Sequence, residues 1–193
     1  MTIVNVGYRS TNFYVLSAGR SRFLVDLGWP GLLGPLLANL ERKGLPLAEI
    51  THGFATHYHP DHAGLAEELK QRGMTLIVTP EQVDFVSQMK QWTKPQDHYV
   101  DITLDECTRV VLLNESRALL KSLGFDGELV HTPGHSDDSV SLLLDDGSVF
   151  TGDLTAPGFA TEDDIEVVTR SWQTLRDRGA TMVYPGHGPI RQL

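Results

Sequence analysis

The six residues His57-Tyr58-His59-Pro60-Asp61-His62 constrain this chain more than any other part of its sequence. They follow a strand-like run, residues 50–56, and precede a helix-like pattern that begins near residue 63. Because alternate side chains of an extended chain point to the same side, His57 and His59 can bind one metal ion. The chain then turns into the helix and directs Asp61 and His62 elsewhere. The spacing therefore predicts two adjacent metal sites.

Three later loops can supply further ligands, and each follows or ends a predicted strand. They are Thr132-Pro133-Gly134-His135-Ser136, Thr151-Gly152-Asp153-Leu154 and Tyr184-Pro185-Gly186-His187-Gly188. The glycine beside each candidate ligand permits a tight turn and a close approach of the backbone. Imidazole nitrogen and carboxylate oxygen suit Zn, Mn or Fe, and a catalytic metal also needs an open position for water. The single cysteine, Cys107, excludes a cysteine cluster, so we expect His and carboxylate ligands.

Length and composition indicate a globular protein of one domain, residues 1–193. The apolar stretch 31–40 is far shorter than the roughly 20 residues of a membrane helix, and the N-terminus lacks the pattern of a secretory signal. We therefore expect no membrane association and a cytoplasmic location. A formal net charge of −9 argues mildly against nucleic acid as a partner, which leaves a small-molecule substrate as the expectation.

Hydrophobic periodicity predicts two β-sheets with helices packed against them. The segment 92–106 has no clear period and is interpreted as a loop or lid. The expected strands are residues 3–6, 12–17, 22–27, 50–56, 75–79, 108–113, 128–131, 140–144, 149–151 and 182–184, and the expected helices are 32–40, 63–72, 80–89, 115–123 and 163–178.

The ordered motifs closely resemble those of the metallo-β-lactamase superfamily, and the set as a whole is similar to that of glyoxalase II. The resemblance runs from Asn12-Phe13-Tyr14-Val15-Leu16 to Pro185-Gly186-His187-Gly188. It implies an α+β fold, a four-layer αββα sandwich of two mixed β-sheets flanked by helices, with a dinuclear metal site between the sheets. It also implies the ligand set: His57, His59 and His135 for the first metal, Asp61, His62 and His187 for the second, and Asp153 as the bridge. Asp26, in Val25-Asp26-Leu27-Gly28, would orient ligands without binding metal.

The resemblance implies a metal-dependent hydrolase with two divalent metal ions, zinc in the first place and iron or manganese as alternatives. Two cations roughly 3.5–4 Å apart lower the pKa of a shared water, which as a bridging hydroxide attacks a polarised carbonyl. Asp61 is the candidate catalytic residue, as a proton shuttle near the leaving group. The expected substrates are esters, thioesters or lactones. Asp153 stands where true β-lactamases of this superfamily use Cys or Ser, which points away from antibiotic hydrolysis.

Other interpretations remain open at this point. The same superfamily contains mononuclear iron dioxygenases that act on persulfides and use a His, His, Asp subset of these positions. Residues 134–138 match part of a serine nucleophile elbow, and a metal-binding protein without catalysis is a further reading. Only six residues follow His187, so we expect no helical substrate domain like that of glyoxalase II, and a dedicated glutathione thioesterase is disfavoured.

Several polar residues near the motifs have structural interpretations. We expect Tyr58 to pack in the interior and His52 to be an ordinary strand residue, whereas His131 is structural or supports a ligand. His98 either lines the substrate mouth or belongs to an aromatic clamp with Trp92 and Tyr99. The run Ser136-Asp137-Asp138-Ser139 either anchors a loop or places negative charge near the site.

Overall fold

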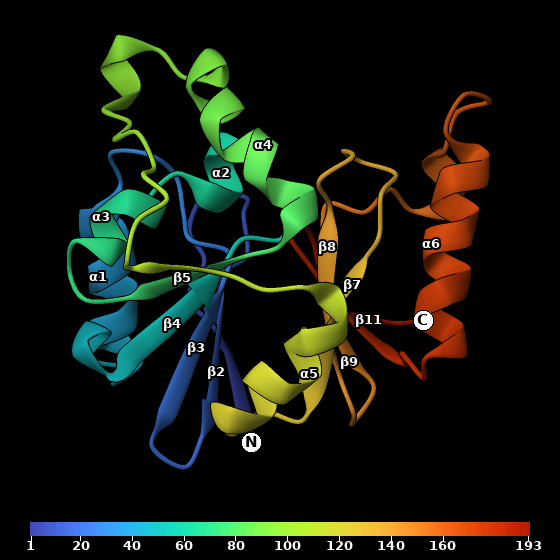
Figure 1. Cartoon of the computed structure of the whole chain (residues 1–193), viewed down its shortest axis with the longest axis horizontal. Coiled ribbons are helices and arrows are strands. Elements are labelled where there is room, and N and C mark those ends of the chain that lie inside the picture. The colour runs from blue at the N-terminus through green and yellow to red at the C-terminus, as the bar shows by residue number, and fades with distance from the viewer.

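The computed structural model describes residues 1–193 and contains two mixed β-sheets that pack face to face (Figure 1). In spatial order the first sheet is β1 (Thr2–Asn5), β2 (Tyr14–Ala18), β3 (Ser21–Val25), β4 (Ile50–Phe54), β5 (Thr75–Val78) and β6 (Thr108–Val110). The second sheet is β11 (Arg191–Gln192), β10 (Met182–Pro185), β9 (Ser148–Gly152), β8 (Val140–Leu144) and β7 (Gly127–His131).

Strand direction follows from the connections. Connections without a helix join β1, β2 and β3 into one antiparallel meander and β7, β8 and β9 into another. Strands β3 to β6 are parallel, and β9 pairs in parallel with β10, because a helical crossover separates each of these pairs. Parallel strands end at the same edge of a sheet. The loops that follow β4, β9 and β10 are therefore available at one end of the sandwich.

Helices cover the outer faces of both sheets (Figure 1). In this view α1, α2 and α3 lie over the first sheet, and α6 lies over the second. Helix α5 packs mainly against β7. The bounds are α1 (Leu33–Arg42), α2 (Pro60–Ala63), α3 (Ala66–Lys70), α4 (Pro80–Gln88), α5 (Leu113–Ser122) and α6 (Ile165–Asp177), with short 3-10 turns at Leu47–Glu49, Met89–Trp92, Pro95–Asp97 and Pro157–Phe159.

The layers are held by separate hydrophobic clusters. Tyr14 and Phe54 from the first sheet meet Phe150 from the second in the cluster between the sheets. Alternate residues of β2 point outward, so Val15 joins a second cluster beneath α1 and α3. Trp172 of α6 is buried in a third cluster against the second sheet. The expected four-layer αββα sandwich is therefore confirmed.

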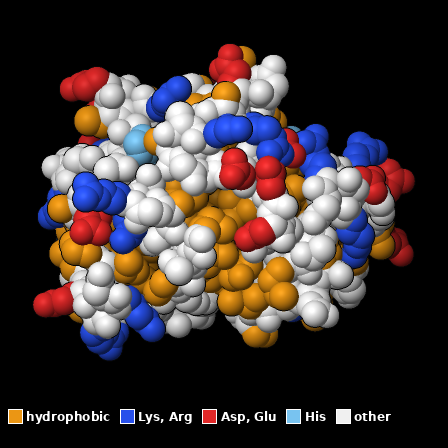
Figure 2. All heavy atoms as spheres, turned by 90° about the horizontal axis from the view of Figure 1, so that it is seen from below, with side chains coloured by type: hydrophobic (Ala, Val, Ile, Leu, Met, Phe, Trp, Pro, Cys, Tyr) orange, Lys and Arg blue, Asp and Glu red, His pale blue; other side chains and the backbone are white.

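Figure 2 turns the molecule so that the side at the bottom of Figure 1 faces the viewer. Figure 2 shows hydrophobic side chains gathered in the middle of this face, with acidic and basic side chains around them. No helix of the chain is long and apolar enough to cross a membrane.

The structure differs from the expected elements in two places. The helix expected at 63–72 begins earlier, at Pro60, and a turn at Gly64 and Leu65 divides it into α2 and α3. Gly64 packs closely against Pro30, since an added Cβ would lie 2.3 Å from it. The two-residue strand β11 carries too little sequence signal to be predicted. Segment 92–106 is largely irregular, as expected, and the buried Lys70 ammonium holds its far end through Asp105 at 3.0 Å.

Candidate metal centre

All seven predicted ligand residues lie at one end of the sandwich, five in loops and two in the short helix α2. The loop after β4 and the start of α2 carry His57, His59, Asp61 and His62. From the second sheet, His135 lies between β7 and β8, Asp153 directly follows β9, and His187 lies shortly after β10. The structure brings these residues together as two groups of potential ligand atoms, and in each group the atoms lie within 4.8 Å of one another.

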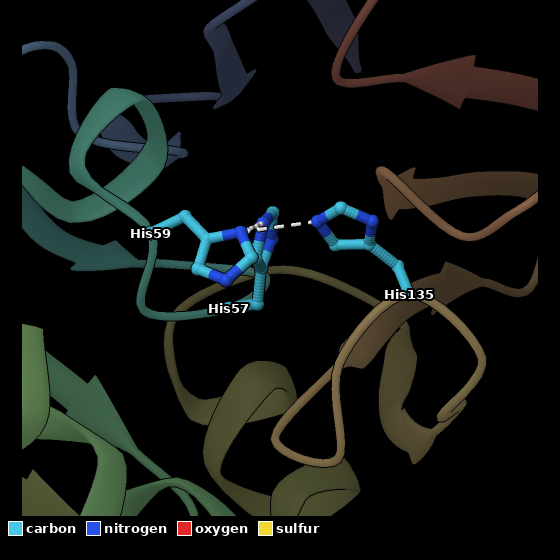
Figure 3. Close-up of side chains that lie close together, drawn as sticks. All are labelled: His57, His59 and His135. Atoms are coloured by element: carbon cyan, nitrogen blue, oxygen red, sulfur yellow. Dashed lines mark hydrogen bonds between the residues drawn. The ribbon is translucent and has the colours of Figure 1, made fainter. Parts of the chain in front are cut away.

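The first group consists of His57, His59 and His135, whose rings point toward one another (Figure 3). The Nδ1 atom of His59 lies 3.1 Å from the Nε2 atom of His57 and 3.1 Å from the Nε2 atom of His135. A neutral imidazole has one nitrogen without a proton, so three such nitrogens can direct lone pairs at one point. This geometry is compatible with three ligands to one cation.

The second group consists of Asp61, His62, Asp153 and His187. The Oδ2 atom of Asp61 lies 3.1 Å from the Nε2 atom of His187 and 3.5 Å from the Nε2 atom of His62. Both histidines also face Asp153, with His62 Nε2 at 3.3 Å from Oδ1 and His187 Nε2 at 3.3 Å from Oδ2. Two carboxylates and two imidazoles therefore converge, which is a donor set that suits a divalent metal.

Asp153 is the residue that links the two groups. Its Oδ2 atom, which faces His187 of the second group, also lies 3.8 Å from the Nε2 atom of His135 in the first group. One carboxylate therefore faces nitrogen donors on both sides, which is the arrangement expected of a bridging ligand.

Polar contacts at the opposite ring nitrogens, two hydrogen bonds and one ion pair, orient three of these histidines. The Nδ1 atom of His187 lies 2.7 Å from the carbonyl oxygen of Ser10, which can only accept a hydrogen bond. That contact places the proton on Nδ1 and leaves Nε2 free as a donor to metal. Similarly, Nδ1 of His57 lies 3.2 Å from the Thr56 hydroxyl, and Nδ1 of His62 lies 3.0 Å from Asp26 Oδ2.

Asp26 lies behind the second group and also fixes the start of the motif. Its Oδ1 atom accepts hydrogen bonds from the backbone N–H and the hydroxyl of Thr56, at 2.8 and 2.9 Å. Its backbone is left-handed, with a φ of 61°, a conformation that Asp and Asn adopt more readily than most residues. The buried Asp26 carboxylate thus holds the His62 ring and the strand end in one arrangement.

Two observations show that this chain fits a bound cation. His62 Nε2 and Asp153 Oδ1 are buried, yet neither makes a well-aligned hydrogen bond within the chain. Buried polar atoms without a partner are costly, and a cation between them would satisfy both. In addition, a Cβ added at Gly186 would lie 2.5 Å from Asp153 Oδ1 and 2.5 Å from His62 Cε1. The glycine leaves room at the point where the donors converge. The cluster is compatible with a divalent metal site.

Proton affinities within the cluster differ between the two groups. Burial, reinforced by the neighbouring histidines, holds the pKa of His57 well below its usual value. Burial also tends to lower the pKa of His62, but the carboxylates of Asp26 and Asp153 outweigh it and hold that pKa well above the usual value. For Asp153, burial tends to raise the pKa, whereas the contact with His62 at 3.3 Å and the surrounding imidazoles lower it overall. The second group thus resembles a set of ion pairs.

The sequence did not identify two residues that hold the ligands in place, Asp138 and Thr11. The buried Asp138 carboxylate accepts a hydrogen bond of 2.7 Å from the backbone N–H of Tyr58, so it anchors the loop between His57 and His59. The Thr11 hydroxyl donates to Asp61 Oδ2 at 3.2 Å. Only the general expectation that residues 136–139 anchor a loop pointed toward the first of these contacts.

The structure also shows where Tyr58, His131 and His98 lie. Tyr58 is buried in the cluster beneath the helices, as expected. His131 contacts the carbonyl oxygen of Asp137 through Nε2 at 2.8 Å, which is a structural contact. His98 lines a pocket that also includes Asp61 and Trp92, and the Trp92 ring lies 6.1 Å from that of His59. His98 therefore faces the approach to the site.

The family model of the metallo-beta-lactamase superfamily matches residues 6–187. The chain belongs to this superfamily. A beta-lactamase-like protein 2 homolog of Caenorhabditis elegans is 28% identical over 184 residues, 94% of this chain and 57% of that protein. An atrochrysone carboxyl ACP thioesterase of Passalora fulva is 26% identical over 193 residues, 95% of this chain and 50% of that protein. The chain thus spans about half the length of the curated relatives it matches.

Solved structures of the superfamily have the same fold. The metallo-beta-lactamase family protein TTHA1429 from Thermus thermophilus is similar with a TM-score of 0.75 at 20% identity, covering 99% of this chain and 74% of that one. The protein TTHA1623, solved in a di-iron-bound form, has a TM-score of 0.73 at 26% identity and covers 100% of this chain and 94% of that one.

Proposed function

We propose that this protein is a metal-dependent hydrolase that holds two divalent cations and cleaves a thioester, with esters and lactones as related substrates. The observation that carries the proposal is the pair of adjacent donor groups with Asp153 facing both of them. Membership in the metallo-β-lactamase superfamily supports a hydrolase, and several relatives are named thioesterases. We infer a small molecule or a carrier-bound acyl group as the substrate, and no nucleic acid.

In this proposal His57, His59 and His135 would hold the first cation, Asp61, His62 and His187 would hold the second, and Asp153 would be shared between them. Zinc is our first expectation, and iron is the main alternative because TTHA1623 was solved in a di-iron-bound form. Two bound cations supply a water of lowered pKa and polarise the carbonyl that is attacked.

The chain itself supplies positioning and a proton-carrying group. The Thr11 hydroxyl donates a hydrogen bond to Oδ2 of Asp61, the oxygen that faces Nε2 of His187, whereas Oδ1 makes no hydrogen bond within the chain. Asp61 also lines the pocket that contains Trp29 and Trp92. We infer that Asp61 carries a proton to the departing sulfur or oxygen at this pocket.

The serine nucleophile elbow is disfavoured by geometry. The Ser136 hydroxyl lies 2.9 Å from the Ser139 hydroxyl and makes no hydrogen bond to a histidine. A serine nucleophile needs a general base within hydrogen-bond reach.

The first test combines metal analysis with thioester hydrolysis. We expect protein purified without added metal to contain about two transition-metal ions per chain and to hydrolyse an acyl thioester of N-acetylcysteamine. Asp153→Ala should lower the metal content and reduce kcat by at least about 100-fold, since it removes the residue between the two groups. Asp84→Asn, which changes an exposed carboxylate on α4, is the matched control.

Two results would overturn the proposal. One is hydrolysis that persists after the metals have been removed by a chelator. The other is a single iron per chain together with oxygen consumption on glutathione persulfide, which would identify a mononuclear dioxygenase instead.

A further inference from the structure

A polar groove lies next to the metal centre, between loop 5–12 and the end of α1. Its volume is about 480 Å³, and its lining includes Arg9, Arg42 and Lys43 but no acidic residue. The formal net charge of the chain is −9, so three cations in one groove run against the overall charge. A local positive field of this kind attracts an anionic ligand.

The three cations are also free of carboxylate partners. Arg22, Lys70 and Arg117 each make an ion pair within the chain, whereas Arg9, Arg42 and Lys43 have no carboxylate within 4.0 Å. Their charges are therefore available to a ligand.

The groove wall is fixed by hydrogen bonds from one side chain of α1. The Asn39 amide donates to the carbonyl oxygens of Val6 and Gly7, at 3.0 and 2.8 Å, and its own oxygen accepts from Arg42. These contacts tie the loop to the helix. The arginine is thus held beside the loop that leads to Arg9.

Arg9 connects the groove to the metal centre. It lines both the groove and the neighbouring pocket of about 350 Å³ that contains Asp61 and Trp92. Its backbone is left-handed, with a φ of 57°, and its guanidinium lies 5.2 Å from the centre of the Trp29 ring. Non-glycine residues rarely adopt this conformation, and such strain is concentrated at functional sites.

Loop 9–11 touches the metal centre directly. Ser10 accepts a hydrogen bond from His187, and Thr11 donates one to Asp61, at 2.7 and 3.2 Å. A ligand that extends from the metal centre past Arg9 therefore enters the groove.

We propose that the groove binds the phosphate of a phosphopantetheinyl leaving group. This inference rests on the proposed thioesterase function. Guanidinium and ammonium groups bind phosphate through charge-assisted hydrogen bonds, and the pantetheine arm would lie along the pocket between Trp29 and Trp92. In the reaction the C–S bond breaks and the oxygen of water bonds to the acyl carbon. One proton of the water passes to sulfur, and the acid product releases the other.

The acyl group would then lie on the other side of the metal centre. A pocket of about 310 Å³ there is lined by His135, Asp153 and His187 together with apolar residues such as Leu154 and Phe159. Asp61 lines the pocket beside the groove and does not line this one, which agrees with its proposed proton transfer to the departing thiol.

The direct test compares the binding of phosphopantetheine and pantetheine by calorimetry. The two ligands carry the same thiol, so any contact of sulfur with metal cancels in the ratio of their Kd values. We expect phosphopantetheine to bind more tightly, and the double variant Arg42→Gln/Lys43→Gln to reduce that ratio by about three- to ten-fold. Lys121→Gln, which removes an exposed charge on α5, should leave the ratio unchanged.

Kinetics separate this inference from the proposed function. The wild-type enzyme should prefer an acyl-coenzyme A over the same acyl thioester of N-acetylcysteamine, and the double variant should lose the preference while hydrolysing the phosphate-free thioester normally. Phosphopantetheine can come from coenzyme A or from a holo carrier protein. Comparing kcat/KM for the same acyl group on each of these two carriers shows which source the enzyme prefers.

The outcomes are distinct. Equal affinity for phosphopantetheine and pantetheine, or a ratio that the double variant does not alter, would refute the groove while leaving thioester hydrolysis intact. An absence of hydrolysis for every thioester would instead refute the proposed function. If Lys121→Gln reduced the ratio of the two Kd values as the double variant does, general charge, and not the groove, would be responsible for the preference.

Discussion

In the proposed two-cation site, replacing Asp26 with asparagine should weaken the binding of the second cation and leave the binding of the first unchanged. Asparagine can keep a carbonyl oxygen at the position of Oδ1, which accepts the two hydrogen bonds from Thr56. Its amide nitrogen must then face Nδ1 of His62, where the native carboxylate oxygen lies at 3.0 Å. An N–H donor there requires Nδ1 to accept, so the ring proton moves to Nε2. That nitrogen belongs to the second donor group and can no longer bind metal.

The size of the effect follows from the contact that is lost. A hydrogen bond to a charged group contributes about 1.5–3 kcal/mol, which corresponds to a roughly 10- to 150-fold change in affinity. Losses of about 10- to 100-fold are typical when a residue that orients a metal ligand is changed. The fold should survive, because asparagine tolerates the left-handed backbone of residue 26.

The assay is equilibrium dialysis against buffered zinc, followed by metal analysis of wild type, Asp26→Asn and the control Asp84→Asn. We expect two binding steps in the wild type and the control, and a selective weakening of one step in Asp26→Asn. A variant that binds both ions with unchanged affinity would refute the inference that Asp26 sets the tautomer of His62. Loss of both ions together would show that Asp26 acts on the whole loop.

Two further predictions concern stability and pH. Asp138→Ala should destabilise the metal-free protein by about 1–3 kcal/mol, since it leaves the buried N–H of Tyr58 unpaired; thermal unfolding in a chelator measures this, and Asp138→Asn, which keeps an acceptor, should lose less. On acidification the second group should release its metal at a higher pH than the first. The raised pKa of His62 lets protons compete with metal above pH 6.5, whereas the lowered pKa of His57 delays that competition to well below 6.5. Metal content after equilibration at a series of pH values tests the order, and simultaneous release would contradict it.

The ligand residues could be predicted because short stretches of adjacent residues identify each of them. The alternation of His57 and His59, and the turn that follows them, are properties of adjacent residues, and the three later ligands stand beside glycines at strand ends. Strand and helix positions followed from periodicity, since each sheet buries one face against helices and the other against its partner sheet.

Contacts between distant residues could not be predicted in the same way. Asp138 and Tyr58 are 80 residues apart, and Thr11 and Asp61 are 50 apart, so no local pattern pairs them. The close packing of Gly64 against Pro30 is also a contact between distant residues, which periodicity does not describe.

Charged residues at buried positions present the same difficulty. Lysine is rarely buried, so Lys70 looks like part of an exposed helix face in the sequence. In the structure its ammonium is enclosed with Glu67 at 3.1 Å and Asp105 at 3.0 Å. The backbone N–H of Thr103 also donates to Glu67. This network ties the aperiodic segment 92–106 to α3, and it arises only from the tertiary fold.

Each donor group draws residues from both sheets, so bound cations would connect the two halves of the sandwich. The halves do not depend on that connection, because Phe23, Phe54 and Phe150 already pack between the sheets. The ligand loops are likewise held by contacts of the protein itself, through Asp26 and Asp138. Since little ordering remains to be done when metal binds, most of the binding free energy can appear as affinity. Because these contacts fix the ligand side chains before a cation binds, a metal site carried largely by loops can still have a precise geometry.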